Sequence, residues 1–315
     1  MPRVRRTCCV IGGAGFIGAS LTPLLVESGR DVVVVGRRDS PDRPPPVGAR
    51  YVSCDYGDRE RLRGILAGTA EVIDLAYSTV PQTSFADPVF DIVSNLPPSV
   101  GMLQEAVSAG VERVVLGSSG GTVYGVAEAL PVREDHPTNP ISPYGITKLA
   151  IEKYGWMFHH VSGLNVVAVR PGNAYGEGQR AGSGQGFVAA AMHAIARGEP
   201  VTVYGEAGTV RDYLHVRDIA HGILAALLHG EAGRAYNIGS GIGRNNLDVL
   251  GAIAPLAKRA GLAVRTEVRP LRAYDVPANI LDSGALNRLS NWQPSVDFKA
   301  GIAATWEQVL RTARG

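Results

Sequence analysis

The sequence predicts an α/β fold of the Rossmann type, a doubly wound parallel sheet with a smaller C-terminal substrate-binding region. Short apolar runs alternate with helical patterns through the first half of the chain. Apolar runs of this kind are typical of parallel strands that are buried on both faces of a sheet. The first run ends in the pattern Gly12-x-x-Gly15-x-x-Gly18. A glycine turn between a strand and a helix lets backbone N–H groups and the helix dipole hold a pyrophosphate.

The expected strands follow one another along the chain, each leading into a helical segment. They lie at residues 10–11, 31–35, 51–52, 72–75, 114–116 and 166–169. Residues 41–46 predict a stiff proline-rich surface loop, and the glycine-rich stretch 176–186 predicts a flexible link or lid. We therefore expect a dinucleotide-binding domain over 1–175, to which a segment at about 212–240 returns. Residues 176–315 form the second region, which completes the substrate cleft.

Composition and charge narrow the class of protein. The chain has 315 residues, of which 45% are hydrophobic and 19% charged, so it can bury a large core. Its formal charge of +2 comes from scattered arginines, and this pattern predicts neither nucleic acid nor a membrane as partner. Three cysteines, Cys8, Cys9 and Cys54, cannot all pair, and glycines interrupt the apolar run near the N-terminus, unlike a secretory signal. A cytoplasmic location is expected.

Tyr144 and Lys148 are the residues that indicate chemistry. The 141–148 stretch starts a helix, and a spacing of four places the phenol and the ammonium on one helical face. A phenol has a pKa of about 10, and lowering it by about three units corresponds to roughly 4 kcal/mol. A neighbouring lysine cation can supply much of this. A hydroxyl from Ser118 or Ser119 can orient a substrate oxygen and relay its proton. These features together predict a redox site in which nicotinamide takes a hydride.

Six segments resemble, in order, the signatures of the extended short-chain dehydrogenase/reductase family, and within it the nucleotide-sugar 4-epimerases. The resemblance covers nearly the whole chain and rests on segments 12–18, 118–125, 142–148, 170–176, 211–216 and 236–241. It implies reversible oxidation at C4 of a UDP-hexose. Tyr144 takes the hydroxyl proton, bound NAD takes the hydride, and a 4-keto sugar turns before the hydride returns, so the cofactor is not consumed.

The resemblance also implies a set of site residues. The catalytic group is Ser119, Thr122, Tyr144 and Lys148. The cofactor contacts are Gly12, Gly15, Phe16, Ile17, Gly18, Arg37, Arg38, Asp55, Tyr56, Ala76, Asn95, Ser118, Tyr144, Lys148 and Pro171. The substrate contacts are Ser119, Tyr144, Asn173, Arg180, Arg211, Arg272, Asp275 and Asn279. A homodimer through helices flanking 100–109 and 149–161 is implied in the same way.

The expected substrate contacts divide by their chemistry. Asn173 meets the uracil-diphosphate side, Arg211 and Arg272 meet the phosphates, and Asp275 meets the uridine ribose. Arginine suits a diphosphate because its planar fork donates two hydrogen bonds at once. Two structural alternatives stay open at this point. Arg211 and its neighbour Asp212 can form a surface ion pair, and Asn173 can be a turn residue.

The sequence departs from the family at Gly120, where a Ser or Thr commonly lies four residues before the motif tyrosine. Glycine cannot relay a proton. The family also has a usual separation between the relay hydroxyl and the catalytic tyrosine. Counted back from Tyr144, Ser119 falls at this separation if the loop between them differs in length by one residue. We therefore expect Ser119 to carry the relay, with Thr122 as the second candidate.

The cofactor-binding strand departs from the family as well. It ends in Gly36-Arg37-Arg38, without the acidic residue that normally binds the ribose of NAD, and these arginines favour a 2′-phosphate. The overall resemblance nevertheless favours NAD, with NADP as the alternative. Arg37 can stack on the adenine, and Asp55 is expected at the adenine amine.

A third departure concerns the sugar. Asn279 stands four residues after Asp275, where the family has a gate beside the sugar's C2 group. Asparagine is intermediate in size and can form hydrogen bonds, so UDP-N-acetylglucosamine and UDP-glucose, each with its galacto epimer, are both candidates. A UDP-uronate is a further candidate, because Arg180 can pair with a carboxylate.

Other functions use the same fold. An NADPH-dependent 4-keto-sugar reductase fits Arg37 and Arg38, and a non-catalytic dinucleotide sensor is the alternative from another class. A 4,6-dehydratase is disfavoured, because Gly121 and Thr122 replace the Asp-Glu pair of such relatives. The seven histidines form no metal-spaced cluster with Cys or Asp, so no metal site is expected.

Overall fold

The computed structural model describes residues 5–41, 43–180, 186–272 and 275–314. Its main feature is a seven-stranded sheet in the order β10-β6-β5-β4-β1-β2-β3, and every neighbouring pair is parallel. The strands are β1 (Thr7–Ile11), β2 (Asp31–Gly36), β3 (Ala49–Ser53), β4 (Glu71–Asp74), β5 (Arg113–Gly117), β6 (Asn165–Pro171) and β10 (Arg234–Ile238). The doubly wound fold predicted from the sequence is confirmed, and all six expected strands lie in this sheet.

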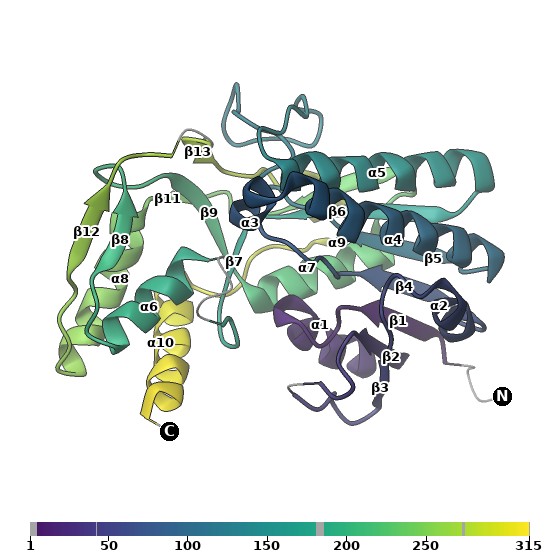
Figure 1. The fold of residues 1–315 in the computed structure, drawn as a ribbon, viewed down its shortest axis with the longest axis horizontal. Coiled ribbons are helices and arrows are strands. Elements are labelled where there is room, and N and C mark those ends of the chain that lie inside the picture. The colour runs from purple at the N-terminus through teal and green to yellow at the C-terminus, as the bar shows by residue number, and fades with distance from the viewer. Residues whose placement is uncertain (1–4, 42, 181–185, 273–274, 315) are drawn as a thin grey trace.

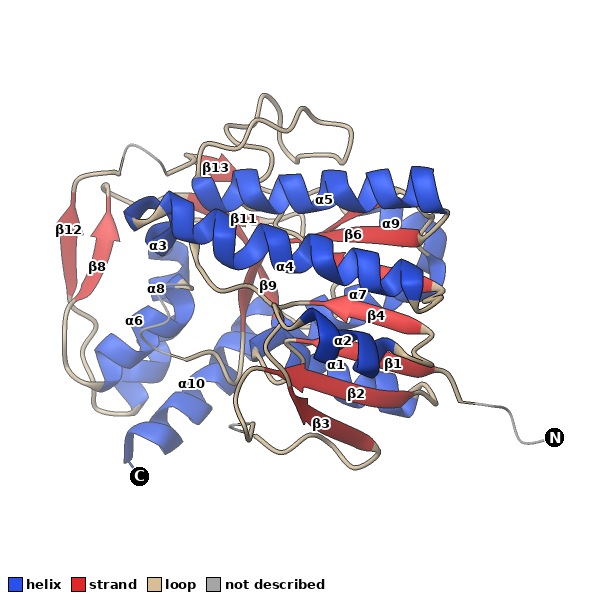
Figure 2. Ribbon diagram, turned by 45° about the vertical axis from the view of Figure 1, so that its right-hand side comes forward, coloured by secondary structure: helices blue, strands red, loops and turns tan. Residues whose placement is uncertain are grey.

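Helices cover both faces of the sheet (Figures 1 and 2). One face carries α1 (Phe16–Glu27) and α7 (Val216–His229), and the other carries α2 (Arg59–Leu66), α4 (Pro88–Ser108) and α5 (Pro143–Ser162). Two apolar cores result because side chains alternate along each strand. Cys8 and Val10 belong to the first core, and Cys9 and Ile11 to the second. All three cysteines are buried and free.

A second region lies beside the carboxyl ends of these strands (Figure 1). It contains a small sheet of β7 (Asn173–Tyr175), β9 (Val210–His215), β11 (Gly243–Arg244) and β13 (Ala278–Asn279), and the pair β8 (Val201–Tyr204) and β12 (Thr266–Arg269). Helices α6 (Phe187–Ala196), α8 (Asn246–Arg259) and α10 (Phe298–Arg314) enclose a third core. The short helices α3 (Pro81–Ala86) and α9 (Gly284–Ser290) complete the fold.

The chain crosses between the two regions more than once. Strand β9 belongs to the small sheet, whereas α7 and β10 pack with the seven-stranded sheet. The division at residue 175 stays a prediction. Residues 181–185 of the expected lid lie outside the described residues.

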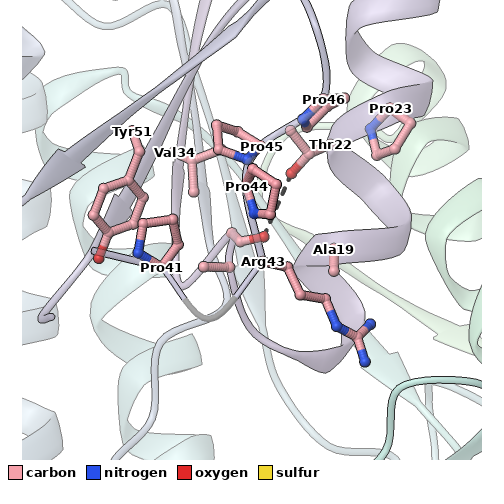
Figure 3. Close-up of a pocket in the computed structure, with 12 residues that line it drawn as sticks. Ala19, Thr22, Pro23, Val34, Pro41, Arg43, Pro44, Pro45, Pro46 and Tyr51 are labelled. Carbon is pink, nitrogen blue, oxygen red and sulfur yellow. Dashed lines mark hydrogen bonds between the residues drawn. The ribbon is translucent and has the colours of Figure 1, made fainter.

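The proline-rich loop lies over the α1 face of the sheet, where it closes a cavity of about 220 Å³. Figure 3 shows its prolines beside Thr22 of α1 and Val34 of β2. None of the Tyr144, Lys148 or Ser119 side chains lines this cavity. Among the helices in the described ranges, none is both long and apolar enough to span a bilayer.

Candidate active site

The glycine turn after β1 is shaped for a pyrophosphate. Gly12 has φ +78°, and a Cβ there would lie 2.8 Å from the backbone nitrogen of Ala76. A Cβ on Gly18 would lie 2.5 Å from the Cα of Gly13, so these two positions require glycine. Helix α1 begins at Phe16 after an exposed Gly15, with no side-chain cap and no acidic residue in its first turn. Its first N–H groups, including those of Phe16 and Ile17, therefore suit an anion, which is the fit that a dinucleotide requires.

Tyr144 and Lys148 enter the site from the start of α5. Ser142 caps this helix by accepting a 3.1 Å hydrogen bond from the N–H of Gly145. The cap sets the helical phase so that Tyr144 and Lys148 face inward, with 7% and 6% of their surfaces exposed. The Lys148 Nζ donates a 2.6 Å hydrogen bond to the carbonyl of Gly117 and lies 5.9 Å from the centre of the Tyr144 ring. The expected pair is therefore docked on the carboxyl end of β5.

The charge of Lys148 is set by opposing effects. Burial lowers the pKa of Lys148 to about 8, and the carboxylates of Asp74, Asp91 and Glu152 act in the opposite direction. Asp74 ends β4, where burial raises the pKa of its own carboxyl group. At neutral pH the ammonium is still mostly protonated, so it can stabilise a phenolate at Tyr144.

Ser118 is directed into the protein interior. Its hydroxyl donates to Glu152, which forms a buried 2.6 Å ion pair with Arg170. Arg170 in turn donates a 2.9 Å hydrogen bond to the hydroxyl of Tyr124, and that hydroxyl donates at 2.7 Å to Asn237. This network joins β5, α5, β6 and β10 and fixes the strand ends on which the site is built.

The structure explains why position 120 is glycine. A Cβ on Gly120 would lie 2.5 Å from the side chain of Leu281 and 2.8 Å from the carbonyl of Arg170. The family's hydroxyl therefore has no room here. The hydroxyl oxygen of Thr122 is buried and has no hydrogen-bond partner within the described ranges, whereas Ser119 is partly exposed.

Arg211 lies near Arg272 and Asp275, although both follow it by more than 60 residues in sequence. Arg211 donates to the carbonyls of Val210 and Val276 at 2.9 and 2.7 Å. Burial lowers the pKa of Arg211. The charge of Arg272 lowers it further, and the nearby carboxylate of Asp275 acts in the opposite direction. Arg272 forms a 2.8 Å ion pair with Asp275. The guanidinium of Arg272 also lies 4.3 Å from the centre of the ring of Tyr204. This arrangement supplies cationic groups and an aromatic face in one place.

Asp212 does not pair with its neighbour Arg211, so the surface ion pair considered from the sequence is wrong. Successive residues of strand β9 point to opposite faces, and Asp212 is fully buried. It accepts hydrogen bonds from the N–H and hydroxyl of Ser240 at 2.8 and 2.5 Å, and from the N–H groups of Gly241 and Leu281. It therefore links the small sheet to two loops.

The remaining substrate residues lie in different environments. Asn173 begins strand β7, so the alternative of a turn residue is wrong, and its amide oxygen is 3.4 Å from where a Cβ of Gly121 would lie. Asn279 is 1% exposed and donates a 3.0 Å hydrogen bond to the carbonyl of Gly120, while its own amide oxygen has no partner in the described part of the chain. Arg180 is exposed, immediately before residues that the structure does not describe.

The other expected cofactor residues are partly at the surface. Arg37, Arg38 and Asp55 are exposed at the ends of β2 and β3. The hydroxyl of Tyr56 donates to Asp74 and so points inward. Asn95 is 2% exposed, and its amide oxygen accepts a 2.7 Å hydrogen bond from the N–H of Ser78 in the loop after β4. Ala76 backs Gly12, and Pro171 ends β6.

Sequence reasoning missed Tyr77, which packs against both catalytic candidates. The Lys148 Nζ lies 4.0 Å from the centre of the Tyr77 ring, and the Tyr144 ring lies 4.8 Å from it edge-on. Asp91 and Glu152 were missed as well. The available signal was the position of Tyr77, two residues beyond a predicted strand that ends beside the glycine turn.

The fold and these side chains define an enzyme of the dinucleotide-binding α/β class. A family model, the NAD dependent epimerase/dehydratase family, matches residues 8–239. A UDP-glucose 4-epimerase of Mycolicibacterium smegmatis is 33% identical over 306 residues, 95% of this chain and 96% of that protein. The chain belongs to this family, as the resemblance of its motifs predicted.

Two solved structures are similar over almost their full length. The UDP-glucose 4-epimerase of Thermotoga maritima, solved with UDP-glucose, has a TM-score of 0.89 and 30% identity, covering 97% of this chain and 99% of that one. The UDP-glucose 4-epimerase of Thermus thermophilus, solved with NAD, has a TM-score of 0.89 and 32% identity, covering 96% and 98%. The expected fold class is thereby confirmed a second time.

Proposed function

We propose that this protein is an NAD-dependent isomerase that inverts C4 of a UDP-sugar through a transient 4-keto sugar. The observation that carries the proposal is the buried pair Tyr144 and Lys148, placed at the same edge of the sheet as the uncapped glycine turn. Nucleotide-sugar epimerases need this combination of a base and a dinucleotide site. Relatives with the same fold act on UDP-glucose, and one was solved with NAD.

The residues of the chain divide the work between proton transfer and binding. NAD bound at the glycine turn supplies the hydride acceptor. Tyr144, as a phenolate, removes the proton of the C4 hydroxyl, and the ammonium of Lys148 stabilises the phenolate charge. Ser119 holds the substrate oxygen. Thr122 is the second candidate for this role, because its hydroxyl oxygen is buried whereas Ser119 is partly exposed.

The diphosphate must be held while the sugar turns. Arg211 and Arg272 lie together beside Asp275, and we assign the diphosphate to the two arginines and the uridine ribose to Asp275. The Tyr204 ring offers a stacking face next to Arg272. Anchoring the nucleotide through these residues leaves the sugar as the part of the substrate that rotates.

The sugar itself is the finer part of the proposal. Asn279 donates to Gly120, one residue from Ser119, and this supports its assignment beside the sugar's C2 group. UDP-glucose and UDP-N-acetylglucosamine are the two substrates to compare. A UDP-uronate that pairs with Arg180 is the third.

We also propose that two copies associate through α4 and α5. These helices lie side by side on one face of the molecule (Figure 2). Six large apolar side chains on them are each more than half exposed: Val89, Phe90, Val93, Ile146, Trp156 and Val161. A second copy presenting the same face would bury them, since C2 pairing matches a patch with itself. Sedimentation should give a dimer for the native chain and a monomer for Trp156→Glu, and a dimer in the variant would contradict the assignment.

Three free, buried cysteines support a cytoplasmic location.

Proton NMR of the purified protein with each UDP-sugar, and no added cofactor, tests the activity directly. Appearance of the galacto anomer to a fixed equilibrium is the expected result, and the faster substrate identifies the preferred C2 group. The dinucleotide released on denaturation should be NAD. Stoichiometric consumption of added NADPH with a 4-keto sugar, and no epimerisation, would instead establish the reductase.

A further inference from the structure

Tyr77 packs against both residues proposed to carry the reaction, but no family signature identified it. It follows β4 in the loop beside the glycine turn. Its ring faces the ammonium of Lys148 at 4.0 Å and meets the ring of Tyr144 at 4.8 Å and 65°. The face of an aromatic ring carries partial negative charge, so this geometry attracts the cation and favours the edge-on contact with the second ring.

The outer end of Tyr77 is held from α4. Its hydroxyl lies 3.5 Å from both carboxylate oxygens of Asp91, which is itself fully buried and also accepts from Thr79. Asn95 on the same helix donates to the carbonyl of Asp91 at 2.7 Å. Burial, with the charge of Asp91, raises the pKa of Tyr77 well above its usual range. Tyr77 therefore stays neutral and does not compete with Tyr144 as a base.

Carboxylates from three elements also attract the ammonium of Lys148. Asp74 ends β4, Asp91 lies on α4, and Glu152 lies one turn further along α5. Nζ itself contacts the Gly117 carbonyl, at 2.6 Å, and the face of the Tyr77 ring, at 4.0 Å from the ring centre. Both contacts bear on where the ammonium lies relative to the phenol.

We propose that Tyr77 is a positioning residue, whose ring keeps water away from Lys148 and Tyr144 and holds the ammonium beside the phenol. The proposal rests on the roles assigned above to Tyr144 and Lys148. The face of the Tyr77 ring, whose centre lies 4.0 Å from Nζ, keeps the cation within Coulomb range of the phenol, and without the ring the cation can move away. Removal of the ring should therefore raise the pKa of Tyr144.

The test compares Tyr77→Leu, which removes the aromatic ring, with Tyr77→Phe, which keeps it and removes only the hydroxyl contact to Asp91. For the holoenzyme with UDP-glucose, Tyr77→Leu should lower kcat at pH 7 about tenfold. The acid limb of its profile of kcat against pH should move up by about one pH unit, and its KM should stay nearly unchanged. Tyr77→Phe should keep the native profile. Bound NAD and thermal melting check that each variant is folded, and Tyr77→Met replaces the leucine variant if that fails to fold.

Three results would overturn the proposal. They are a Tyr77→Leu profile that superimposes on the native one, an activity of that variant that falls by the same factor at every pH, and a Tyr77→Phe enzyme that behaves like the leucine variant. Absorbance at 295 nm, with Tyr144→Phe as the blank, measures the phenol pKa without any assay of turnover. An active Tyr144→Phe would refute the proposed function of Tyr144, whereas an unshifted phenol pKa in Tyr77→Leu would refute the role of Tyr77 alone.

Discussion

Replacing Lys148 by methionine removes a buried cation and keeps a flexible side chain of similar length. The Lys148 Nζ lies 5.9 Å from the centre of the Tyr144 ring. At an effective dielectric constant of about 20, two unit charges at this separation interact by roughly 3 kcal/mol, or about two pKa units. Loss of the cation disfavours the phenolate, so the pKa of Tyr144 rises. We expect kcat of Lys148→Met to fall about 100-fold at pH 7 and to recover as the pH is raised.

The assay is the pH dependence of kcat for UDP-glucose epimerisation, followed by NMR on protein that retains its NAD. Lys153→Met is the matched control, because Lys153 lies on the same helix but is exposed. It should leave the profile unchanged. The electrostatic role assigned to Lys148 would be refuted if the acid limb of the Lys148→Met profile lay at the same pH as that of the native enzyme. It would also be refuted if kcat fell by the same factor at every pH.

Three further predictions concern stability and the proton relay. Gly120→Ser should destabilise the enzyme by about 1–3 kcal/mol in denaturant unfolding and should not raise kcat. The reason is that the Cβ of the serine meets the Arg170 carbonyl as well as Leu281. A gain in activity would contradict this prediction. Ser119→Ala should lower kcat roughly 100-fold and at least as much as Thr122→Ala, and the reverse ranking in the NMR assay would exclude Ser119 as the relay. The pKa of Lys148 is lowered to about 8 in the folded enzyme, so above that pH the unfolded chain binds more protons than the folded one. The free energy of unfolding of the native enzyme should therefore rise between about pH 8 and 10 relative to that of Lys148→Met. Denaturant unfolding of both proteins at each pH measures this, and a difference that stays constant with pH would count against it.

Features encoded by short spacings were predictable from the sequence. The interval of four between Tyr144 and Lys148 places both on one helical face whatever surrounds the helix. The turn from Gly12 to Gly18 is equally local, since a positive φ and the start of α1 lie within seven residues. Six strands were found from their apolar runs. Five of them are largely buried, and a strand buried on both faces leaves little choice of residue, whereas β3 at the sheet edge is only partly buried.

Contacts between distant segments were not predictable in this way. The sequence by itself determined the class of chemistry, through the glycine turn, the Tyr144 and Lys148 pair and the order of the motifs. Only the tertiary structure decided that Leu281 closes position 120, that Asp212 turns away from Arg211, and that Tyr77 packs against both catalytic candidates. The physical reason is that these contacts arise where separate elements pack against each other, and no local periodicity encodes which side chains then meet.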